Sequence, residues 1–104
     1  MKLVYDNETL RRFCRERGIA KLELFGSALR DDFRGESDVD LLCTLTEETD
    51  QRCGLLEWVD LQLGLQNIFG RPVDLVSRRA VERSRNPYRR ETILANPEPL
   101  YVEG

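Results

Sequence analysis

The residues best suited to chemistry are the carboxylates Asp38 and Asp40, which stand at the start of an apolar run with one residue between them. Side chains alternate along a β-strand, so both carboxylates would point to the same face, about 7 Å apart along the strand. Two such charges repel each other unless a cation lies between them, and magnesium prefers oxygen ligands. With Asp74 as a third carboxylate in a later apolar run, the pattern predicts a metal site.

A second feature lies upstream, where Gly26 and Ser27 directly follow a predicted strand and open a predicted short helix. Backbone N–H groups at such a helix start bind anions, glycine lets a phosphate approach the backbone, and the serine hydroxyl donates to a phosphate oxygen. A phosphate-binding turn beside a dicarboxylate metal site is the equipment of phosphoryl or nucleotidyl transfer.

The composition excludes several other chemistries. The chain of 104 residues has no His, so it lacks Ser-His-Asp and Cys-His catalysis and His-ligated zinc. Its three cysteines are odd in number and form no CxxC pair, which argues against a disulfide scaffold or a zinc knuckle. We expect Cys14, Cys43 and Cys53 to be reduced thiols, with the first two in the core. Any catalysis must therefore depend on carboxylates.

The charge balance restricts the partners. A net charge of -3 argues against a broad nucleic-acid-binding surface, so no direct nucleic-acid binding is expected. The charge is uneven, because segment 78–91 carries six Arg against two Glu. No apolar run approaches the roughly 20 residues of a membrane span, and the N-terminus has no apolar signal core. We therefore expect a cytoplasmic protein with no membrane association.

The elements that must position these residues follow from hydrophobic periodicity and from turn residues. Asn7 is a candidate helix cap, and Gly18 and Gly70 are candidate helix ends. In chain order we expect a helix over 7–17, a strand over 20–25, a short helix over 27–32, a strand over 38–45, a helix over 51–69, a strand over 73–76, a helix over about 87–95 and an extended tail. This order predicts an α/β fold with a small mixed sheet, in one domain over residues 1–104.

The long predicted helix is apolar on more than one face. We expect a stripe of Leu55, Trp58, Val59 and Ile68 to pack on the sheet. The surplus of apolar residues has two interpretations, a generous core or a surface for a partner or a second copy.

These motifs together resemble the DNA polymerase β-like nucleotidyltransferase superfamily. The resemblance is carried by Gly26-Ser27, by Arg30, by the run Gly35-Glu36-Ser37-Asp38-Val39-Asp40 and by the strand Pro72-Val73-Asp74-Leu75-Val76. The short length and the C-terminal sequence NPYRRETILANPEPLYV resemble the minimal nucleotidyltransferase (MNT) antitoxin branch. The likeness covers nearly the whole chain. We expect the protein to lack the additional helical domain of larger members, which helps those enzymes to hold the nucleotide base and the acceptor.

The resemblance implies a polymerase β-like nucleotidyltransferase fold and a specific site. Asp38 and Asp40 would coordinate one or two magnesium ions, and Asp74 would complete the catalytic metal site and help to remove the acceptor proton. Gly26 and Ser27 would hold the triphosphate of ATP. Many MNT proteins are antitoxins paired with HEPN-domain toxins, and active members transfer AMP to a toxin tyrosine, which makes them protein adenylyltransferases (AMPylators). The resemblance therefore also implies that the protein forms a complex or oligomer with such a toxin.

Some of these residues also have simpler structural interpretations. Ser27 is a natural helix cap, and Ser37 is suited to fixing the loop before Asp38. Arg30 is a candidate phosphate ligand, but it could instead pair with Asp31 or Asp32 on the surface. We interpret Asp31 and Asp32 as solvated rather than as metal ligands.

Two rival functions remain open at this level. One is nucleotidyl transfer to a small molecule or to RNA. The other is a non-catalytic antitoxin that masks its toxin by binding, which the broad apolar helix over 51–69 would serve. The sequence gives neither the acceptor residue nor the preferred nucleotide.

Overall fold

A computed structural model describes residues 5–25, 39–86, 91, 94 and 97–103. The elements in chain order are α1 (Asn7–Arg17), β1 (Ile19–Phe25), β2 (Val39–Leu45), α2 (Glu47–Arg52), α3 (Leu55–Phe69), β3 (Val73–Ser77), α4 (Arg78–Glu82) and β4 (Glu98–Val102). The predicted short helix over 27–32 lies outside the described residues.

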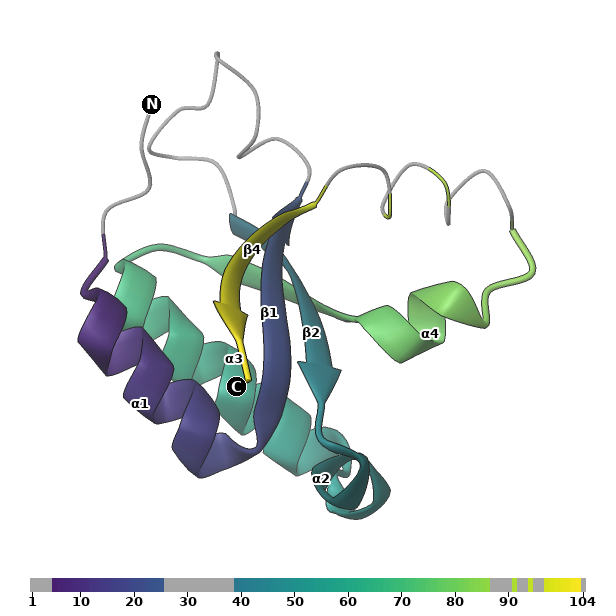
Figure 1. The fold of residues 1–104 in the computed structure, drawn as a ribbon, viewed down its shortest axis with the longest axis horizontal. Coiled ribbons are helices and arrows are strands. Elements are labelled where there is room, and N and C mark those ends of the chain that lie inside the picture. Colours follow the sequence, from purple (N-terminus) through teal and green to yellow (C-terminus); the bar gives the residue numbers. More distant parts are fainter. Residues whose placement is uncertain (1–4, 26–38, 87–90, 92–93, 95–96, 104) are drawn as a thin grey trace.

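The four strands form one mixed sheet in the order β3-β2-β1-β4 (Figure 1). Strand β1 pairs antiparallel with both β2 and β4, whereas β2 and β3 are parallel. The predicted fold class, a small mixed sheet packed with helices, is confirmed. The tail expected to be extended is the edge strand β4.

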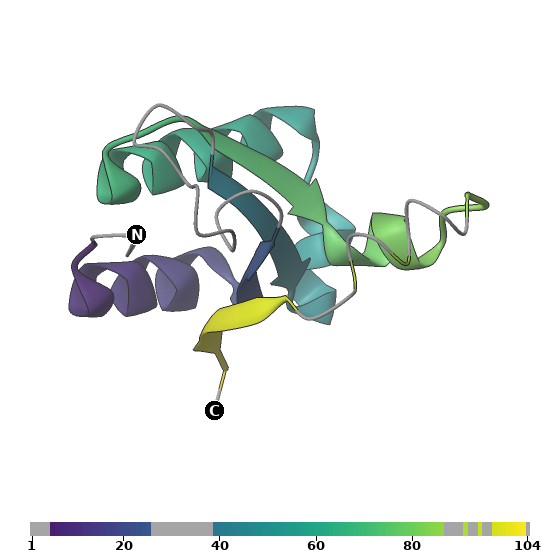
Figure 2. The same ribbon diagram turned by 90° about the horizontal axis from the view of Figure 1, so that it is seen from above.

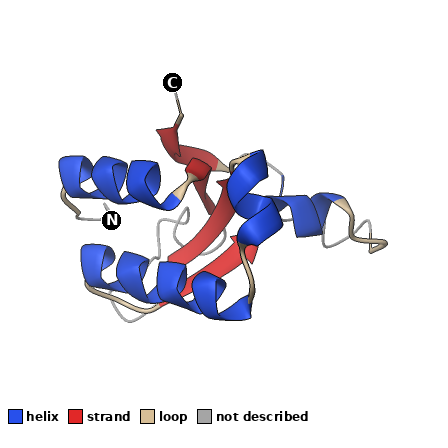
Figure 3. Ribbon diagram, turned by 90° about the horizontal axis from the view of Figure 1, so that it is seen from below, coloured by secondary structure: helices blue, strands red, loops and turns tan. Residues whose placement is uncertain are grey.

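Helices α1 and α3 lie side by side on one face of the sheet, and α4 lies beyond the other face (Figures 2 and 3). Alternation along β2 explains the two layers, because Val39, Leu41 and Cys43 belong to the main core beneath α1 and α3. Leu42 points the other way and is also fully buried, and Val81 of α4 is 4% exposed. We call this second side of the sheet the α4 face.

Helix α1 matches the predicted range but not the predicted cap. Asp6 rather than Asn7 is the N-cap residue, and the Thr9 hydroxyl donates a hydrogen bond to its carboxylate. Gly18 ends the helix in the left-handed conformation with φ 74°, as expected. Leu10 and Cys14 are completely buried.

The single helix predicted over 51–69 is two helices, with the break at Cys53 and Gly54. The Thr46 hydroxyl accepts from the Thr49 N–H at 3.3 Å and so starts α2, whose first residue, Glu47, lies four residues before the predicted helix start. Gly54 is extended, and its N–H donates to the Glu57 carboxylate at 3.0 Å. The strong cap at Thr46 and the flexible Gly54 together outweigh the apolar pattern that suggested one continuous helix.

The predicted packing stripe of α3 was wrong at two of its four residues. Leu61, Leu65 and Phe69, spaced four residues apart, are the buried residues of this helix. Leu55 is 79% exposed and Val59 is 43% exposed. Trp58 and Ile68 do pack against the core, as partly buried residues. Hydrophobic periodicity could not show which face of this helix is buried, because the helix is apolar on several faces.

Helix α4 was not predicted, because its five residues are too few to show a helical period. The Ser77 hydroxyl accepts from the Ala80 N–H at 3.3 Å and starts the helix. Arg79 lies 3.5 Å from the Asp50 carboxylate. Of the helix expected over 87–95, only Glu91 and Leu94 are described, and both are helical.

Across the described ranges, no helix has the combination of length and apolar character needed to cross a membrane.

Two glycines provide a matched test of how α2 packs on the turn between α1 and β1. Gly18 and Gly70 both have left-handed φ values, 74° and 68°, so alanine at either position costs about 1–2 kcal/mol in backbone strain. A Cβ on Gly18 would lie 2.0 Å from the Thr49 hydroxyl oxygen, whereas a Cβ on Gly70 meets no atom within 4 Å. We expect Gly18→Ala to lower the free energy of unfolding by at least about 1 kcal/mol more than Gly70→Ala. Urea denaturation of both variants measures the difference, and equal losses would contradict the packing of α2 described above.

Candidate active site

Two of the predicted metal ligands lie side by side on neighbouring strands. Asp40 of β2 pairs in register with Asp74 of the parallel strand β3, and Phe25 of β1 pairs with Asp40 on the other side. Adjacent strands are about 4.8 Å apart, a separation at which one divalent cation can contact both carboxylates. The structure thus brings Asp40 and Asp74 together, and Asp38 lies outside the described residues.

The strands present these side chains on the α4 face because of the residues beside them. Val39 and Leu41 flank Asp40, and Val73 and Leu75 flank Asp74, and all four are buried toward the other face. Asp40 is half-buried and Asp74 is exposed. Asp74 is therefore not buried in an apolar environment, and the structural support for a metal site is its in-register pairing with Asp40.

The donor set fits a hard divalent cation, since both groups are carboxylates that lie on one face in one row. No group of three His, Cys, Asp or Glu side chains placed to hold a metal occurs in the described part of the chain. Asp40 and Asp74 would supply two ligands of such a cation, and we predict that a third comes from a residue such as Asp38.

The phosphate-binding residues predicted from the sequence also stay predictions. Gly26, Ser27, Arg30 and Ser37 lie outside the described residues. Strand β1 ends at Phe25, which pairs with Asp40. Because Gly26 is the next residue in the chain, the predicted phosphate-binding turn begins at the same end of the sheet as the carboxylate pair.

Sequence reasoning missed a buried ion pair on the same face. Glu23 of β1 is 3% exposed, and it accepts a hydrogen bond from the Arg78 guanidinium at the start of α4. Lys21 lies 3.5 Å from the same carboxylate. Burial alone would lower the pKa of Arg78, but hydrogen bonds and charge from Glu23 and Glu82 raise it above its ordinary value.

This ion pair crosses β2, because Glu23 pairs in register with Leu42 and Arg78 directly follows β3. It therefore holds the start of α4 against the strand that carries Asp40. The signal for it was present in the sequence as a lone Glu within the apolar strand Leu22-Glu23-Leu24.

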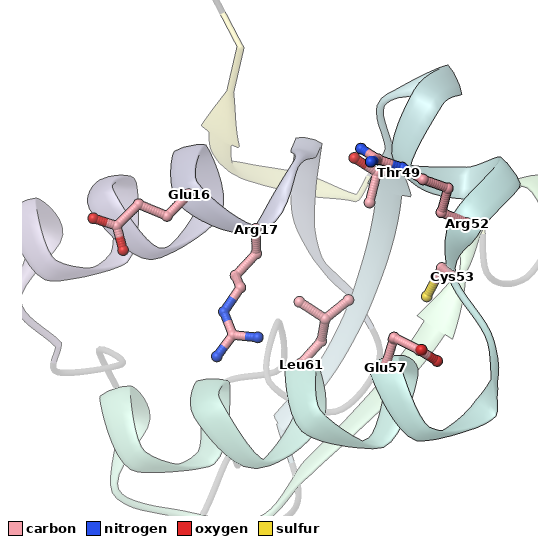
Figure 4. A pocket seen from close by; sticks show the side chains of 7 residues that line it. All are labelled: Glu16, Arg17, Thr49, Arg52, Cys53, Glu57 and Leu61. Atoms are coloured by element: carbon pink, nitrogen blue, oxygen red, sulfur yellow. The ribbon is translucent and has the colours of Figure 1, made fainter.

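A pocket of about 360 Å³ lies between α1, α2 and α3 (Figure 4). It is lined by Glu16, Arg17, Thr49, Arg52, Cys53, Glu57 and Leu61. None of these is a predicted site residue. Two acidic side chains balance two basic ones, so the lining has no excess charge to hold a metal or a triphosphate. We therefore place the chemistry at the carboxylate pair rather than in this pocket.

Comparison with known proteins identifies the family. The sequence model of the nucleotidyltransferase domain matches residues 7–96. The chain belongs to the nucleotidyltransferase domain family. No curated protein matches it in sequence.

Three solved structures share the nucleotidyltransferase fold. One, provisionally described as a minimal nucleotidyltransferase, is 34% identical with a TM-score of 0.61, over 90% of this chain and 95% of that one. A toxin–antitoxin structure with AMP-PNP is 17% identical, with a TM-score of 0.67 over 93% of this chain and 73% of that one. A mutant of the toxin–antitoxin MntA-HpeT is 15% identical, with a TM-score of 0.65 over the same shares of the two chains.

These comparisons confirm the resemblance to minimal nucleotidyltransferases that the motifs indicated. Family membership supports nucleotidyl transfer as the class of activity. The two toxin–antitoxin structures show likeness of fold, since their sequence identity is low.

The three thiols of this nucleotidyltransferase stand apart from the carboxylates. Burial raises the pKa of Cys14 to about 12 and that of Cys43 to about 12. Cys53 is partly exposed, and its pKa is raised by burial and then by the charges of Glu57 and Asp50. None is activated as a nucleophile, because a reactive cysteine needs a lowered pKa.

Thiol labelling tests this assignment. At pH 8 the thiols of Cys14 and Cys43 remain protonated and inaccessible, so a disulfide reagent such as DTNB should label one thiol per native chain. Cys53→Ser should abolish that reaction, and unfolding in denaturant should expose the remaining two thiols. Rapid labelling of more than one thiol in the native protein would contradict the buried positions of Cys14 and Cys43.

Proposed function

We propose that this protein is a cytoplasmic, magnesium-dependent nucleotidyltransferase that transfers AMP from ATP to a tyrosine hydroxyl of a HEPN-type toxin and thereby acts as its antitoxin. The observation that carries the proposal is the in-register pair Asp40 and Asp74 in a chain of the nucleotidyltransferase family. Asp38, two residues before Asp40, would add the third carboxylate.

The chain's own residues have separate tasks in this reaction. Asp38, Asp40 and Asp74 would hold magnesium, which would stabilise the charge that develops on the attacking and leaving oxygens. Gly26 and Ser27 bind the triphosphate, with Arg30 and Ser37 beside them. The acceptor oxygen attacks the α-phosphorus and the bond to pyrophosphate breaks. Because the chain has no His, the proton of the acceptor hydroxyl passes to a carboxylate, for which Asp74 is suited by its exposure.

The structural neighbours support the choice of ATP as the nucleotide and of a toxin as the partner. One neighbour is a toxin–antitoxin structure with AMP-PNP, an analogue of ATP, and another is the toxin–antitoxin MntA-HpeT. The net charge of -3 suits a basic, RNA-binding toxin as the partner. A binding-only antitoxin is the second candidate, favoured by the exposed Leu55 and Leu56 of α3.

The first test measures transfer directly. Purified protein is incubated with magnesium, α-labelled ATP and a lysate of the source cells, and the products are separated into protein, RNA and small molecules. We expect label on one discrete protein. Asp38→Ala or Asp40→Ala should reduce it by at least about 10³-fold, since each removes a ligand of the metal that stabilises the transition state.

The matched control is Asp31→Ala, which removes a nearby carboxylate that we interpret as solvated and should leave transfer unchanged. Full activity of folded Asp38→Ala and Asp40→Ala would refute the assigned site. Label in RNA or in small molecules would show that the acceptor is not a protein, while nucleotidyl transfer itself would be confirmed. Absence of label with every nucleotide tested, together with intact toxin neutralisation, would select the binding-only antitoxin.

A second test concerns the metal alone. A cation that binds between Asp40 and Asp74 stabilises the folded state by mass action, about 2.7 kcal/mol at a hundredfold excess over its Kd. We expect Mg²⁺ or Mn²⁺ to raise the Tm of the wild-type protein and to have no effect on Asp40→Asn or Asp74→Asn. Without metal, Asp74→Asn should be at least as stable as wild type, because one of two adjacent like charges is gone. An equal rise in Tm for all three proteins would place the metal elsewhere.

A further inference from the structure

Helix α3 exposes a continuous apolar stripe that the carboxylate site does not use. Leu55, Leu56, Val59 and Leu63 are 79%, 81%, 43% and 52% exposed. Leu55, Val59 and Leu63 follow one another at intervals of four residues, and Leu56 lies beside Val59 and Leu63, so the four form one row on the helix surface. We call this row the α3 stripe.

The α3 stripe and the candidate carboxylate site lie on opposite sides of the sheet. Helix α3 covers one face of the sheet through Leu61 and Leu65, whereas Asp40 and Asp74 lie on the α4 face. A molecule that covers the stripe therefore leaves the carboxylate pair accessible.

The surroundings of the stripe are acidic. From Glu47 to Phe69, helices α2 and α3 carry five acidic residues against Arg52 alone. Even when Arg79 and Arg17 are counted, which pair with Asp50 and Asp60, this region keeps a net charge of -2. Asp60 directly borders the stripe, since it lies four residues after Leu56 and three before Leu63. Asp60 is 55% exposed even though it pairs with Arg17, so its charge still faces the solvent.

This charge decides between the possible occupants of the stripe. A symmetric dimer through α3 would place the same acidic surface of two copies against each other, and such like-charge contacts are unfavourable. A partner whose apolar face is bordered by Lys or Arg gains both from apolar burial and from charge complementarity. The partner's docking segment is best formed by a helix, because a ridge of residues at intervals of four packs into the groove between the corresponding ridges of another helix.

We propose that the α3 stripe is a docking surface for an amphipathic helix of a partner protein whose apolar face is rimmed by basic residues. The proposal stands on the exposure and charge of α2 and α3, and it holds whether or not the protein transfers AMP.

The test uses two designed helical peptides with the same leucine face, one rimmed by Lys and the other by Glu. The reporter is Trp58, the only tryptophan in the chain, which lies on α3 next to Val59. Titration of the full-length protein should change the Trp58 fluorescence with the Lys-rimmed peptide. The Glu-rimmed peptide should bind at least tenfold more weakly.

The decisive variant is Leu56→Gln/Leu63→Gln, which removes apolar surface without altering the charge and replaces residues too exposed to support the core. It should weaken binding of the Lys-rimmed peptide at least tenfold. The matched control, Val102→Gln, replaces a 58% exposed valine on β4 and should bind like wild type. Unfolding curves of both variants confirm that the fold is intact.

Three results would overturn the proposal. The first is equal binding by the double variant, and the second is equal binding of the two peptides. The third is dimerisation of the wild-type protein in sedimentation equilibrium that the double variant loses, which would make a second copy the occupant. Failure of AMP transfer alters none of these readouts, so the docking surface and the proposed function are tested separately.

Discussion

The position of β3 beside β2 is the constraint on which the candidate site depends. The Val39 N–H donates to the Pro72 carbonyl at 2.9 Å, and the Val73 N–H donates to the Gln66 side chain at 3.2 Å. These two bonds fix where β3 begins relative to β2 and to the end of α3. A slip of one residue would turn Asp74 into the core and Val73 out to solvent, because side chains alternate with a period of two. The burial of Val73 and Leu75 therefore selects the register that aligns Asp74 with Asp40.

The electrostatics of the α4 face follow from the same register. The row that contains Asp40 and Asp74 carries two acidic groups, whereas the next row contains Glu23 in contact with two cations, Arg78 and Lys21. Glu23 is thus held by ion pairs within the protein, which makes it a structural carboxylate rather than a candidate metal ligand. The contact between Arg78 and Glu23 also fixes the position on the sheet at which the short helix α4 begins.

Sequence reasoning worked where local signals are strong and failed where the tertiary structure decides. The strands of the sheet, the left-handed ends at Gly18 and Gly70, and the family could all be predicted, since each depends on alternation, on a glycine or on motif spacing. The buried face of α3 could not be predicted, because a helix that is apolar on all sides buries whichever residues happen to meet α1 and the sheet. The Glu23–Arg78 pair joins residues 55 positions apart, and no local pattern connects them. For the site itself, the sequence named Asp40 and Asp74 but could not show that they are cross-strand neighbours.

The place of β4 in the sheet has a consequence for synthesis of the protein. Strand β1 ends at Phe25, yet one of its two neighbours is β4, which begins 73 residues later at Glu98. Until then β1 has an open edge while β2 and β3 are already able to pair, and open strand edges attract other chains. The half of the sheet that carries the carboxylates can thus pair first, while the opposite edge of β1 stays open to other chains until β4 has been made.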